Sequence, residues 1–296
     1  MSWRAGLAFV ALGIIWGVPY FFIKLAVQEL SPFVVAWARI TLAVLILLPI
    51  AWRRDALRPL RSHKSAVVVF GMAEFAVPFV AIAIGERWID SSLTGILIAA
   101  VPLTILLISR FFGIEERLGL WRLLGLGLGL AGVVALLGFG TVTWPLGWIG
   151  VACVLIATVG YAIGPLIIQR HFRGFDSLGP VAASLLVASL VLLLPAALAM
   201  PHSMPSAVVL SSIAVLGVVC TALAMLLMFY LVGHAGASRA SIVTYVNPAV
   251  ATLLGVWLLQ ERLGLGGYLG FALVLIGSWL ATRSGAVAVK AQAEAA

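Results

Sequence analysis

The chain has 296 residues, of which 64% are hydrophobic and 9% are charged, and it carries a formal net charge of +8. This composition leaves too few polar side chains to cover a water-soluble fold, which indicates that most of the surface faces lipid. The positive charge does not indicate a nucleic-acid partner, because the Lys and Arg residues lie in short loops between apolar runs, where they orient a membrane protein. Cys153 and Cys220 both fall inside apolar runs, so neither a disulfide nor a metal-thiolate site is predicted.

Apolar runs long enough to cross a membrane follow one another along the whole chain. A helical span needs about 20 residues to cross a hydrocarbon core about 30 Å thick. The sequence therefore predicts an all-α integral membrane protein with ten transmembrane helices, and the first run is too long for a cleaved signal peptide. The ten runs cover residues 6–27, 32–52, 65–85, 91–112, 119–138, 146–169, 178–199, 206–231, 238–259 and 263–281.

Lys and Arg residues are distributed unequally between the two sets of loops. One set has fourteen of them, whereas the other has only Arg87 and Arg262. The positive-inside rule predicts that the richer set is cytoplasmic, with both chain termini, in a multi-pass protein of the cell inner membrane. Residues 284–296 are predicted to form a disordered cytoplasmic tail. The fourteen are Arg4, Arg53, Arg54, Arg58, Arg61, Lys64, Arg110, Arg117, Arg122, Arg170, Arg173, Arg239, Arg283 and Lys290.

A repeat relates the two halves of the chain. Three pairs of prolines share one sequence separation, and the motif Glu-Arg-Leu-Gly-Leu occurs at 116–120 and again at 261–265. We therefore predict two repeats of five spans, residues 1–140 and 141–283. Because five is odd, the second repeat enters the membrane upside down, as is usual in secondary transporters that work by alternating access. The proline pairs are Pro19 with Pro165, Pro49 with Pro195, and Pro102 with Pro248.

Prolines within the runs indicate where the helices bend. A helical proline removes a backbone hydrogen bond, and a membrane helix tolerates this where a neighbour or a cavity satisfies the freed carbonyl. Pro49 and Pro195 lie near the ends of runs and are interpreted as ordinary membrane-helix prolines. A hinge or cavity role is predicted for Pro19, Pro78, Pro102, Pro165 and Pro248.

Two ionisable residues lie deep in apolar runs, where a charge is costly and is by default a candidate for function. Glu74 lies about ten residues into the third run, and Arg39 lies about seven residues into the second, at a depth of about 10 Å. These depths allow an ion pair. The pair either only fixes helix packing, or it tunes the pKa of Glu74, whose carboxylate then meets a proton or the amino group of a substrate. Lys24, near the outer end of the first run, is expected to snorkel to the interface.

Aromatic and amide side chains near the mid-span prolines are candidates for lining a substrate cavity. Two of them, Trp16 and Tyr20, are four residues apart and would share one face of the first helix. Such a lining suits an aromatic or apolar solute with one polar end. The alternative is that the Trp and Tyr residues belong to interfacial belts. The candidates are Trp16, Tyr20, Tyr161, Tyr245 and Asn247.

No enzyme is predicted. The four His residues lie in loops or at the ends of runs, and neither H-E-x-x-H nor G-x-S-x-G occurs. Glu74 is the only acidic residue deep in a run, so a carboxylate dyad cannot be assembled. The G-x-G-x-x-G match at 127–132 lies inside a run with no preceding strand, which excludes a dinucleotide site. We expect neither a cofactor nor a metal.

Several residues match the pattern of a known family. They are Trp16-Gly17 and Lys24 in the first run, Arg39 in the second, Asn247-Pro248 in the ninth, Glu261-Arg262 in the connection that follows it, and Gly270 in the tenth. In these the chain resembles the EamA-type permeases of the drug/metabolite transporter superfamily, over nearly its whole length. The resemblance implies a ten-span inner-membrane carrier with a central cavity. Within the family the chain is most similar to the YddG-type exporters of aromatic and other neutral amino acids.

These features together predict a secondary transporter. It would export small amphipathic metabolites, foremost aromatic and other neutral amino acids, across the inner membrane by alternating access. One alternative is a proton-coupled exporter of organic cations or drugs in which Glu74 is the exchanging site. Another is a membrane scaffold without transport, which the inverted repeat disfavours. The expected partners are a small-molecule substrate and the lipid bilayer.

Glycines four residues apart mark the fifth and tenth runs. Gly125 and Gly129 form one such pair, and Gly266 and Gly270 form the other. Glycines at this spacing give a smooth face against which another helix can pack closely. We therefore predict either a monomer or a weak homodimer that forms through these faces.

Overall fold

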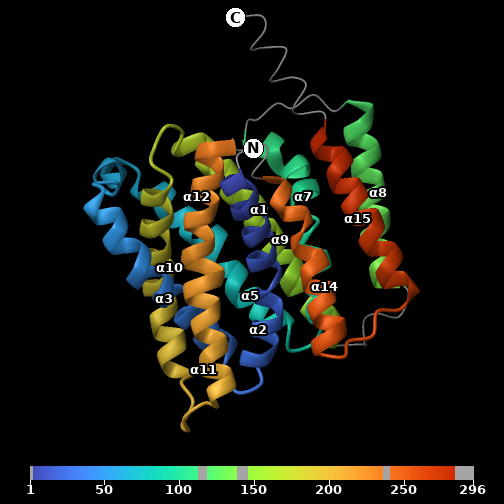
Figure 1. Cartoon of the computed structure of the whole chain (residues 1–296), viewed down its shortest axis with the longest axis horizontal. Coiled ribbons are helices and arrows are strands. Elements are labelled where there is room, and N and C mark those ends of the chain that lie inside the picture. Colours follow the sequence, from blue (N-terminus) through green and yellow to red (C-terminus); the bar gives the residue numbers. More distant parts are fainter. Residues whose placement is uncertain (1–2, 113–118, 139–145, 236–240, 284–296) are drawn as a thin grey trace, which may run out of the picture.

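The computed structural model describes residues 3–112, 119–138, 146–235 and 241–283, and every regular element within them is helical (Figure 1). In the first repeat the helices are α1 (Trp3–Gly17), α2 (Pro19–Ala26), α3 (Pro32–Arg53), η1 (Arg58–Ser62), α4 (Lys64–Phe70), η2 (Gly71–Ala76), α5 (Val77–Gly85), α6 (Ser91–Ile98), α7 (Val101–Ile108), η3 (Ser109–Phe112) and α8 (Leu120–Gly138). In the second they are α9 (Leu146–His171), α10 (Leu178–Leu198), α11 (Ala207–Ala214), η4 (Val215–Leu223), α12 (Ala224–Ala235), η5 (Ser241–Tyr245), α14 (Asn247–Leu258) and α15 (Leu265–Arg283).

The helices group into the ten predicted spans. Eight stretches are long and apolar enough to cross a membrane, and two shorter apolar helices, Val243–Leu258 and Leu265–Ala281, supply the ninth and tenth. The predicted all-α fold with ten membrane helices is therefore confirmed. The ninth run was expected to begin at residue 238, which lies outside the described residues.

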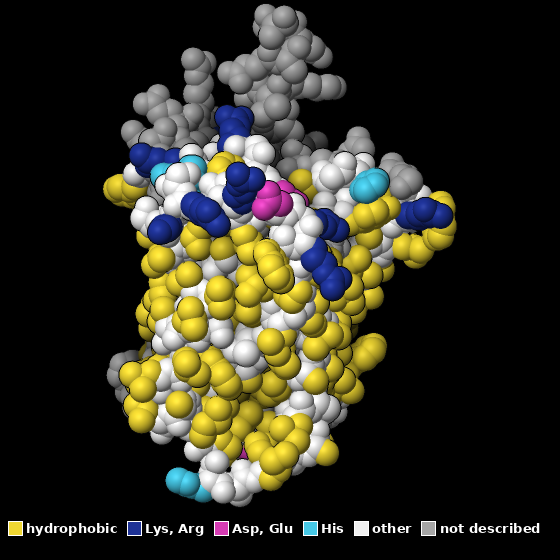
Figure 2. Space-filling view, turned by 90° about the vertical axis from the view of Figure 1, so that its left-hand side faces the viewer, with side chains coloured by type: hydrophobic (Ala, Val, Ile, Leu, Met, Phe, Trp, Pro, Cys, Tyr) yellow, Lys and Arg dark blue, Asp and Glu magenta, His cyan; other side chains and the backbone are white. Residues whose placement is uncertain are grey.

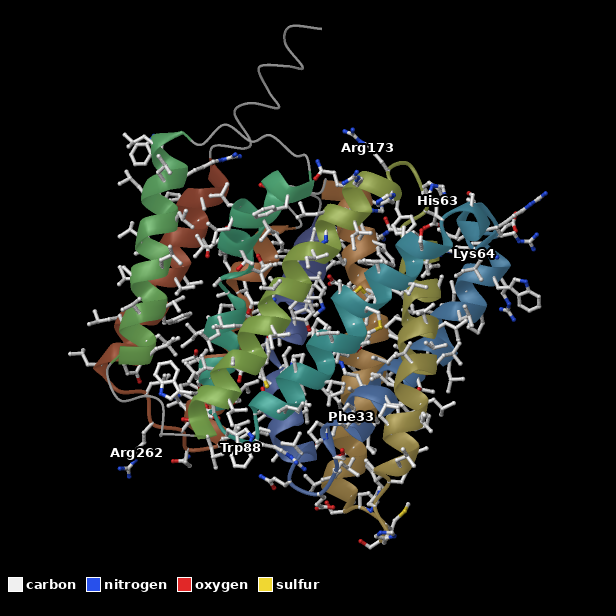
Figure 3. All side chains as sticks on the ribbon, turned by 180° about the vertical axis from the view of Figure 1, so that it is seen from behind. Phe33, His63, Lys64, Trp88, Arg173 and Arg262 are labelled. Carbon is white, nitrogen blue, oxygen red and sulfur yellow. The ribbon has the colours of Figure 1, made fainter. Side chains whose placement is uncertain are left out.

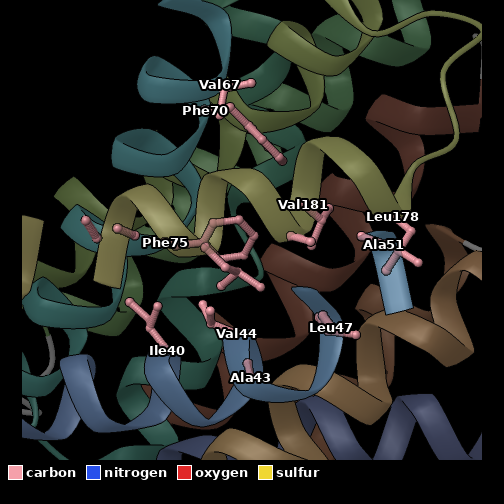
Figure 4. Packing of buried hydrophobic residues seen from close by; sticks show 14 of the residues in the cluster. Ile40, Ala43, Val44, Leu47, Ala51, Val67, Phe70, Phe75, Leu178 and Val181 are labelled. Carbon is pink, nitrogen blue, oxygen red and sulfur yellow. The ribbon is translucent and has the colours of Figure 1, made fainter. Parts of the chain in front are cut away.

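Equivalent helices of the two repeats pack against each other. The second span, α3, packs on the seventh, α10, and the fifth, α8, packs on the tenth, α15. Figure 1 shows these two pairs at opposite sides of the bundle. Buried side chains such as Ile40 and Leu47 of α3 and Val181 of α10 fill the α3–α10 interface (Figure 4). A two-fold axis in the membrane plane, which relates inverted repeats, produces this packing of each helix against its equivalent.

Both repeats contain one π-helical segment, η2 in the third span and η4 in the eighth. A π-helix bonds each N–H to the carbonyl five residues earlier, which bulges the backbone and is frequent at functional sites. The glycines of these segments approach the other repeat closely. A Cβ on Gly71 would lie 2.6 Å from the carbonyl oxygen of Ser184 in α10, and one on Gly217 would lie 2.5 Å from Cβ of Leu42 in α3. The two contacts are equivalent, so each π-helix is packed against the neighbouring repeat.

Four of the five predicted hinge prolines coincide with a change of helix. Pro19, Pro102 and Pro248 each stand in the first turn of a new helix, after an interruption of the span. Pro78 stands in the first turn of α5, directly after η2. Pro165 differs, because it lies inside the continuous helix α9. For the three prolines that follow an interruption, this position costs no hydrogen bond, since the missing N–H would have no partner there. The hinge roles stay predictions.

The glycine faces of α8 and α15 pack against each other within one chain. A Cβ on Gly125 would lie 2.6 Å from the carbonyl oxygen of Gly277, and one on Gly132 would lie 2.7 Å from the backbone nitrogen of Val274. Gly270 in turn meets the carbonyl oxygen of Gly132 at 2.8 Å. In this conformation these glycines are covered by helices of the same chain, and the choice between a monomer and a weak homodimer stays a prediction.

Gly132→Ala is expected to lower the stability of the protein. The added methyl group collides with the backbone of α15, and such overpacking typically costs about 1–3 kcal/mol. Gly127→Ala, in the same helix, is the matched control, because its added Cβ would meet no described atom within 4 Å apart from its own stretch of helix. The apparent melting temperature in detergent should fall for Gly132→Ala only. Equal melting temperatures for the two variants would contradict the close approach of α8 and α15.

Basic side chains gather at one end of the bundle. Figure 2 shows Lys and Arg side chains along one rim, above a broad band of hydrophobic side chains that fits the lipid-facing surface of a membrane protein. In Figure 3, Lys64 and Arg173 lie at this end, whereas Trp88 and Arg262 lie at the other. We call these the basic end and the opposite end. The positive-inside rule predicts that the basic end is cytoplasmic.

Candidate transport site

Glu74 lies in the bulged segment η2 and faces α9. Its side chain is half-buried, and a Cβ on Gly164 of α9 would collide with its carboxylate. Within the described part of the chain, Oε2 of Glu74 is buried and has no hydrogen-bond partner. A buried oxygen of this kind is costly unless a ligand or a proton satisfies it. Glu74 is thus placed to receive a cationic group or a proton.

Arg39 is buried in α3 and is held by a different set of contacts. Its side chain is 6% exposed, its Nε donates to Oγ1 of Thr221 at 2.8 Å, and its guanidinium carbon lies 3.9 Å from the ring centroid of Phe79. Among the described residues Arg39 makes no ion pair with Glu74. The predicted ion pair is therefore absent, because the hydroxyl of Thr221 and the ring of Phe79 stabilise the guanidinium instead.

Thr221 is a site residue that the sequence did not reveal. It lies in η4 next to Cys220, and its hydroxyl donates to the carbonyl of Leu216, five residues earlier, at 2.8 Å. The π-helical geometry of η4 therefore aims the lone pairs of this hydroxyl at Arg39. The signal for it in the sequence was the position of Cys220, which the repeat aligns with Glu74.

Two of the predicted aromatic residues pack in one apolar cluster near these charges. Tyr20 is 7% exposed and packs in a cluster of apolar side chains with Tyr161. Tyr161 lies within electrostatic reach of Arg39, Tyr20 and Glu74. The structure therefore brings four of the predicted residues into one central constellation from α2, α3, η2 and α9. We call Tyr20, Arg39, Glu74 and Tyr161 the central constellation.

Trp16 does not share a face with Tyr20. It packs against an apolar cluster that includes Leu12 and Leu231, whereas Tyr20 belongs to another cluster. The shared face predicted from their spacing is wrong, because the first span is interrupted between α1 and α2 and the helical periodicity does not continue across Pro19.

Tyr245 and Asn247 take different positions around the interruption of the ninth span. The hydroxyl of Tyr245 donates to the carbonyl of Ser278 in α15 at 3.0 Å, which ties the side chain to the edge of the bundle. Asn247 is half-buried at the start of α14, beside Gly17 of α1. Its Oδ1 is buried without a hydrogen-bond partner in the described residues. Asn247 therefore stays a candidate for substrate binding, whereas Tyr245 has a structural contact.

Lys24 does not snorkel to the interface. Its Nζ donates to the backbone carbonyls of Glu86 and Ile89, at 2.7 Å each, and so ties α2 to the turn that follows α5. The snorkelling prediction is wrong, because the turn folds over the end of α2 and offers two backbone carbonyls to the ammonium group. The turn belongs to the opposite end of the bundle.

Glu86 is a second buried carboxylate that the sequence analysis did not single out. It follows the third span, is 0% exposed, and neither of its carboxylate oxygens has a hydrogen-bond partner among the described residues. Burial raises the pKa of Glu86 well above its usual range, with a further increase from Glu261, and the nearby charges of Lys24 and Arg39 oppose this shift. No group of three His, Cys, Asp or Glu side chains in the described ranges could hold a metal ion.

Glu86→Gln is expected to raise stability at alkaline pH. Because the pKa of Glu86 is raised in the folded state, the folded protein binds this proton more tightly than the unfolded chain does. Stability therefore falls as pH rises from the unfolded pKa of about 4.3 through the higher folded value. The variant lacks this loss, so its melting temperature should exceed that of the native protein at pH 8 and approach it near pH 4.5.

Glu29→Gln is the matched control with the opposite sign. Hydrogen bonds from the side chain and the backbone N–H of Ser206 lower the pKa of Glu29, which lies at the same end. The stability that Glu29 contributes is present above its unfolded pKa and is lost as pH falls through the lowered value. If the melting temperatures of Glu86→Gln and of the native protein differed by the same amount at every pH, this would contradict the burial of a proton-binding carboxyl.

Comparison with known proteins decides the family. The profile of the EamA-like transporter family matches residues 3–138 and, separately, residues 148–283. The chain belongs to the EamA-like transporter family. This places it in the drug/metabolite transporter superfamily, as the sequence resemblance implied. The two matches cover the two five-span halves one by one.

Several curated relatives align along most of their length. An uncharacterized inner membrane transporter of Escherichia coli K12, YedA, is 29% identical over 93% of this chain and 89% of its own length. An uncharacterized transporter of Archaeoglobus fulgidus is 27% identical over 90% and 95%. The uncharacterized transporter YoaV of Bacillus subtilis is 22% identical over 93% and 96%. A protein of known crystal structure shares the fold, with a TM-score of 0.66 and 21% identity over 96% of this chain and 98% of that one.

Proposed function

We propose that the protein is an inner-membrane secondary transporter that exports small amphipathic metabolites, foremost aromatic and other neutral amino acids, by alternating access. Membership of a transporter family and the name of the Escherichia coli relative support transport across the inner membrane. The interrupted first, fourth and ninth spans support the mechanism, because such breaks at the interface of inverted repeats are typical of carriers. The basic end would face the cytoplasm.

The main support for this substrate class is that two opposite charges in the core are separated from each other. Glu74 and Arg39 do not neutralise each other, and Tyr20 and Tyr161 lie with them in the central constellation. A neutral amino acid offers an ammonium group to the carboxylate, a carboxylate to the guanidinium, and an apolar or aromatic side chain to the tyrosines. This favours the assignment to the YddG-type exporters.

Flux through the reconstituted protein tests this proposal. Proteoliposomes loaded with labelled phenylalanine should release it faster than protein-free liposomes, and unlabelled tyrosine or leucine should compete. Phenethylamine, which lacks the carboxylate, should compete poorly. If no neutral amino acid moves under any gradient, the amino acid assignment is wrong, and failure of all solutes tested would favour a scaffold without transport.

One observation favours a second candidate function, proton-coupled export of organic cations. Oε2 of Glu74 is buried without a partner in the described residues, and a lone carboxylate at this depth can exchange a proton for a cation. A pH gradient distinguishes the two. An imposed gradient should drive uptake of an organic cation in the second case, and it should not be required for phenylalanine efflux in the first.

A further inference from the structure

The carboxylate of Glu261 joins the two repeats at the opposite end. It accepts hydrogen bonds from the backbone N–H of Ser91 at 2.8 Å and of Ser92 at 2.9 Å. It also accepts from the two serine hydroxyls, at 2.8 Å and 2.5 Å. These donors are at the start of α6, so the carboxylate caps that helix and meets the positive end of its dipole. Four donors of the first repeat therefore bind one side chain of the second repeat.

The backbone around Glu261 is shaped to bring the carboxylate to α6. The N–H of Glu261 donates to the carbonyl of Gly255 in α14 at 3.1 Å, and Gln260 adopts a left-handed conformation with φ of 57°. A Cβ on Gly255 would collide with both the carboxylate and the hydroxyl of Ser92. Glycine at this position therefore leaves the space in which the contact forms.

This contact lies over one side of the central constellation. One turn deeper in α14, Ala251 is 1% exposed, and its Cβ would lie 2.6 Å from a Cβ on Gly95 of α6. The ring of Tyr20 lies 3.6 Å from the same position on Gly95. The start of α6 and the last turns of α14 therefore pack against each other. They lie between the opposite end of the bundle and Tyr20.

We propose that Glu261 is the latch that holds the opposite end of the transporter closed in this state, and that its release from Ser91 and Ser92 opens the central constellation to that side. The inference rests on the proposed alternating access. It gives the second Glu-Arg-Leu-Gly-Leu motif a role, since the loop between the ninth and tenth spans carries the latch residue to the fourth span.

Labelling of a buried cysteine tests the latch without knowledge of the substrate. In the background Cys153→Ser, Cys220→Ala, the reporter Ala251→Cys should react slowly with a membrane-impermeant maleimide added from the opposite end. Glu261→Gln removes the charge from the cap, and we expect it to raise the labelling rate about tenfold or more, because hydrogen bonds to a charged acceptor are the strong ones. Gly255→Ala should raise the rate without changing any charge.

Two further variants keep the test decisive. Glu29→Gln removes an exposed contact between the repeats at the same end, the bond from the N–H of Ser206, and should leave labelling near the native rate. If Glu261→Gln does not fold, the double variant Ser91→Ala, Ser92→Ala retains the two backbone donors and should give a smaller increase. Native labelling rates in folded Glu261→Gln and Gly255→Ala, or in the folded serine double variant, would overturn the latch.

A disulfide separates failure of the latch from failure of the proposed function. Ser92→Cys with Gly255→Cys should cross-link under oxidation, abolish transport of any solute that the native protein moves, and recover on reduction. Full transport by the cross-linked protein would overturn the latch. Absence of amino acid flux in the native protein, with the labelling changes still seen, would reject the proposed substrate and leave the latch standing.

Discussion

Replacement of Glu74 by Gln is expected to reduce efflux of neutral amino acids about tenfold to a hundredfold. The variant keeps the shape of the side chain and removes the charge that would pair with the substrate ammonium, and a hydrogen bond to a charged group contributes about 1.5–3 kcal/mol. The measurement is the initial rate of labelled phenylalanine efflux from proteoliposomes with equal protein content. For an organic cation driven by a pH gradient, the same change should abolish uptake and its pH dependence.

Gly164→Ala is the companion variant for this experiment. Its added methyl group displaces the Glu74 carboxylate from α9 and leaves the charge in place, so a loss of flux would show that the position of the carboxylate matters. Glu74→Asp shortens the side chain with the same consequence. Unchanged phenylalanine flux in Glu74→Gln would exclude both an essential ammonium contact and an essential proton role for Glu74 in that transport.

Replacement of Arg39 by Gln is expected to remove the preference for substrates that carry a carboxylate. In the native protein phenylalanine should compete far better than phenethylamine, because the guanidinium would bind the substrate carboxylate. In the variant the two should compete similarly, and phenylalanine efflux should fall about tenfold or more. The measurement is the concentration of each compound that halves efflux of labelled phenylalanine.

Thr221→Val supplies the control for positioning. It removes the acceptor of the Nε hydrogen bond and retains the guanidinium, so the apparent KM for phenylalanine should rise while the preference for a carboxylate remains. Arg39→Lys keeps the charge and loses the planar fork, and should give an intermediate loss. A native preference for phenylalanine in Arg39→Gln would show that Arg39 does not meet the substrate.

The sequence pointed to the residues of the central constellation, but it did not predict which residues each of them contacts. Glu74 and Arg39 were found from the cost of a charge within an apolar run, which needs no knowledge of neighbours. Their separation depends on Thr221 and Phe79, which reach Arg39 from the eighth and third spans. Depth along a helix is set by sequence position, but the direction of a side chain around the bundle is set by packing.

The sequence by itself determined the class of the protein, the ten helices, the duplication and the segregation of basic residues. Each follows from composition, run length or spacing, which a bilayer constrains strongly because every backbone group must be satisfied within the span. The contacts between distant segments were decided only in the tertiary structure. Glu86 and Glu261 lie in the connections that follow the third and ninth runs. Folding buries the first and joins the second to Ser91 and Ser92, since these contacts depend on how the two repeats close on each other.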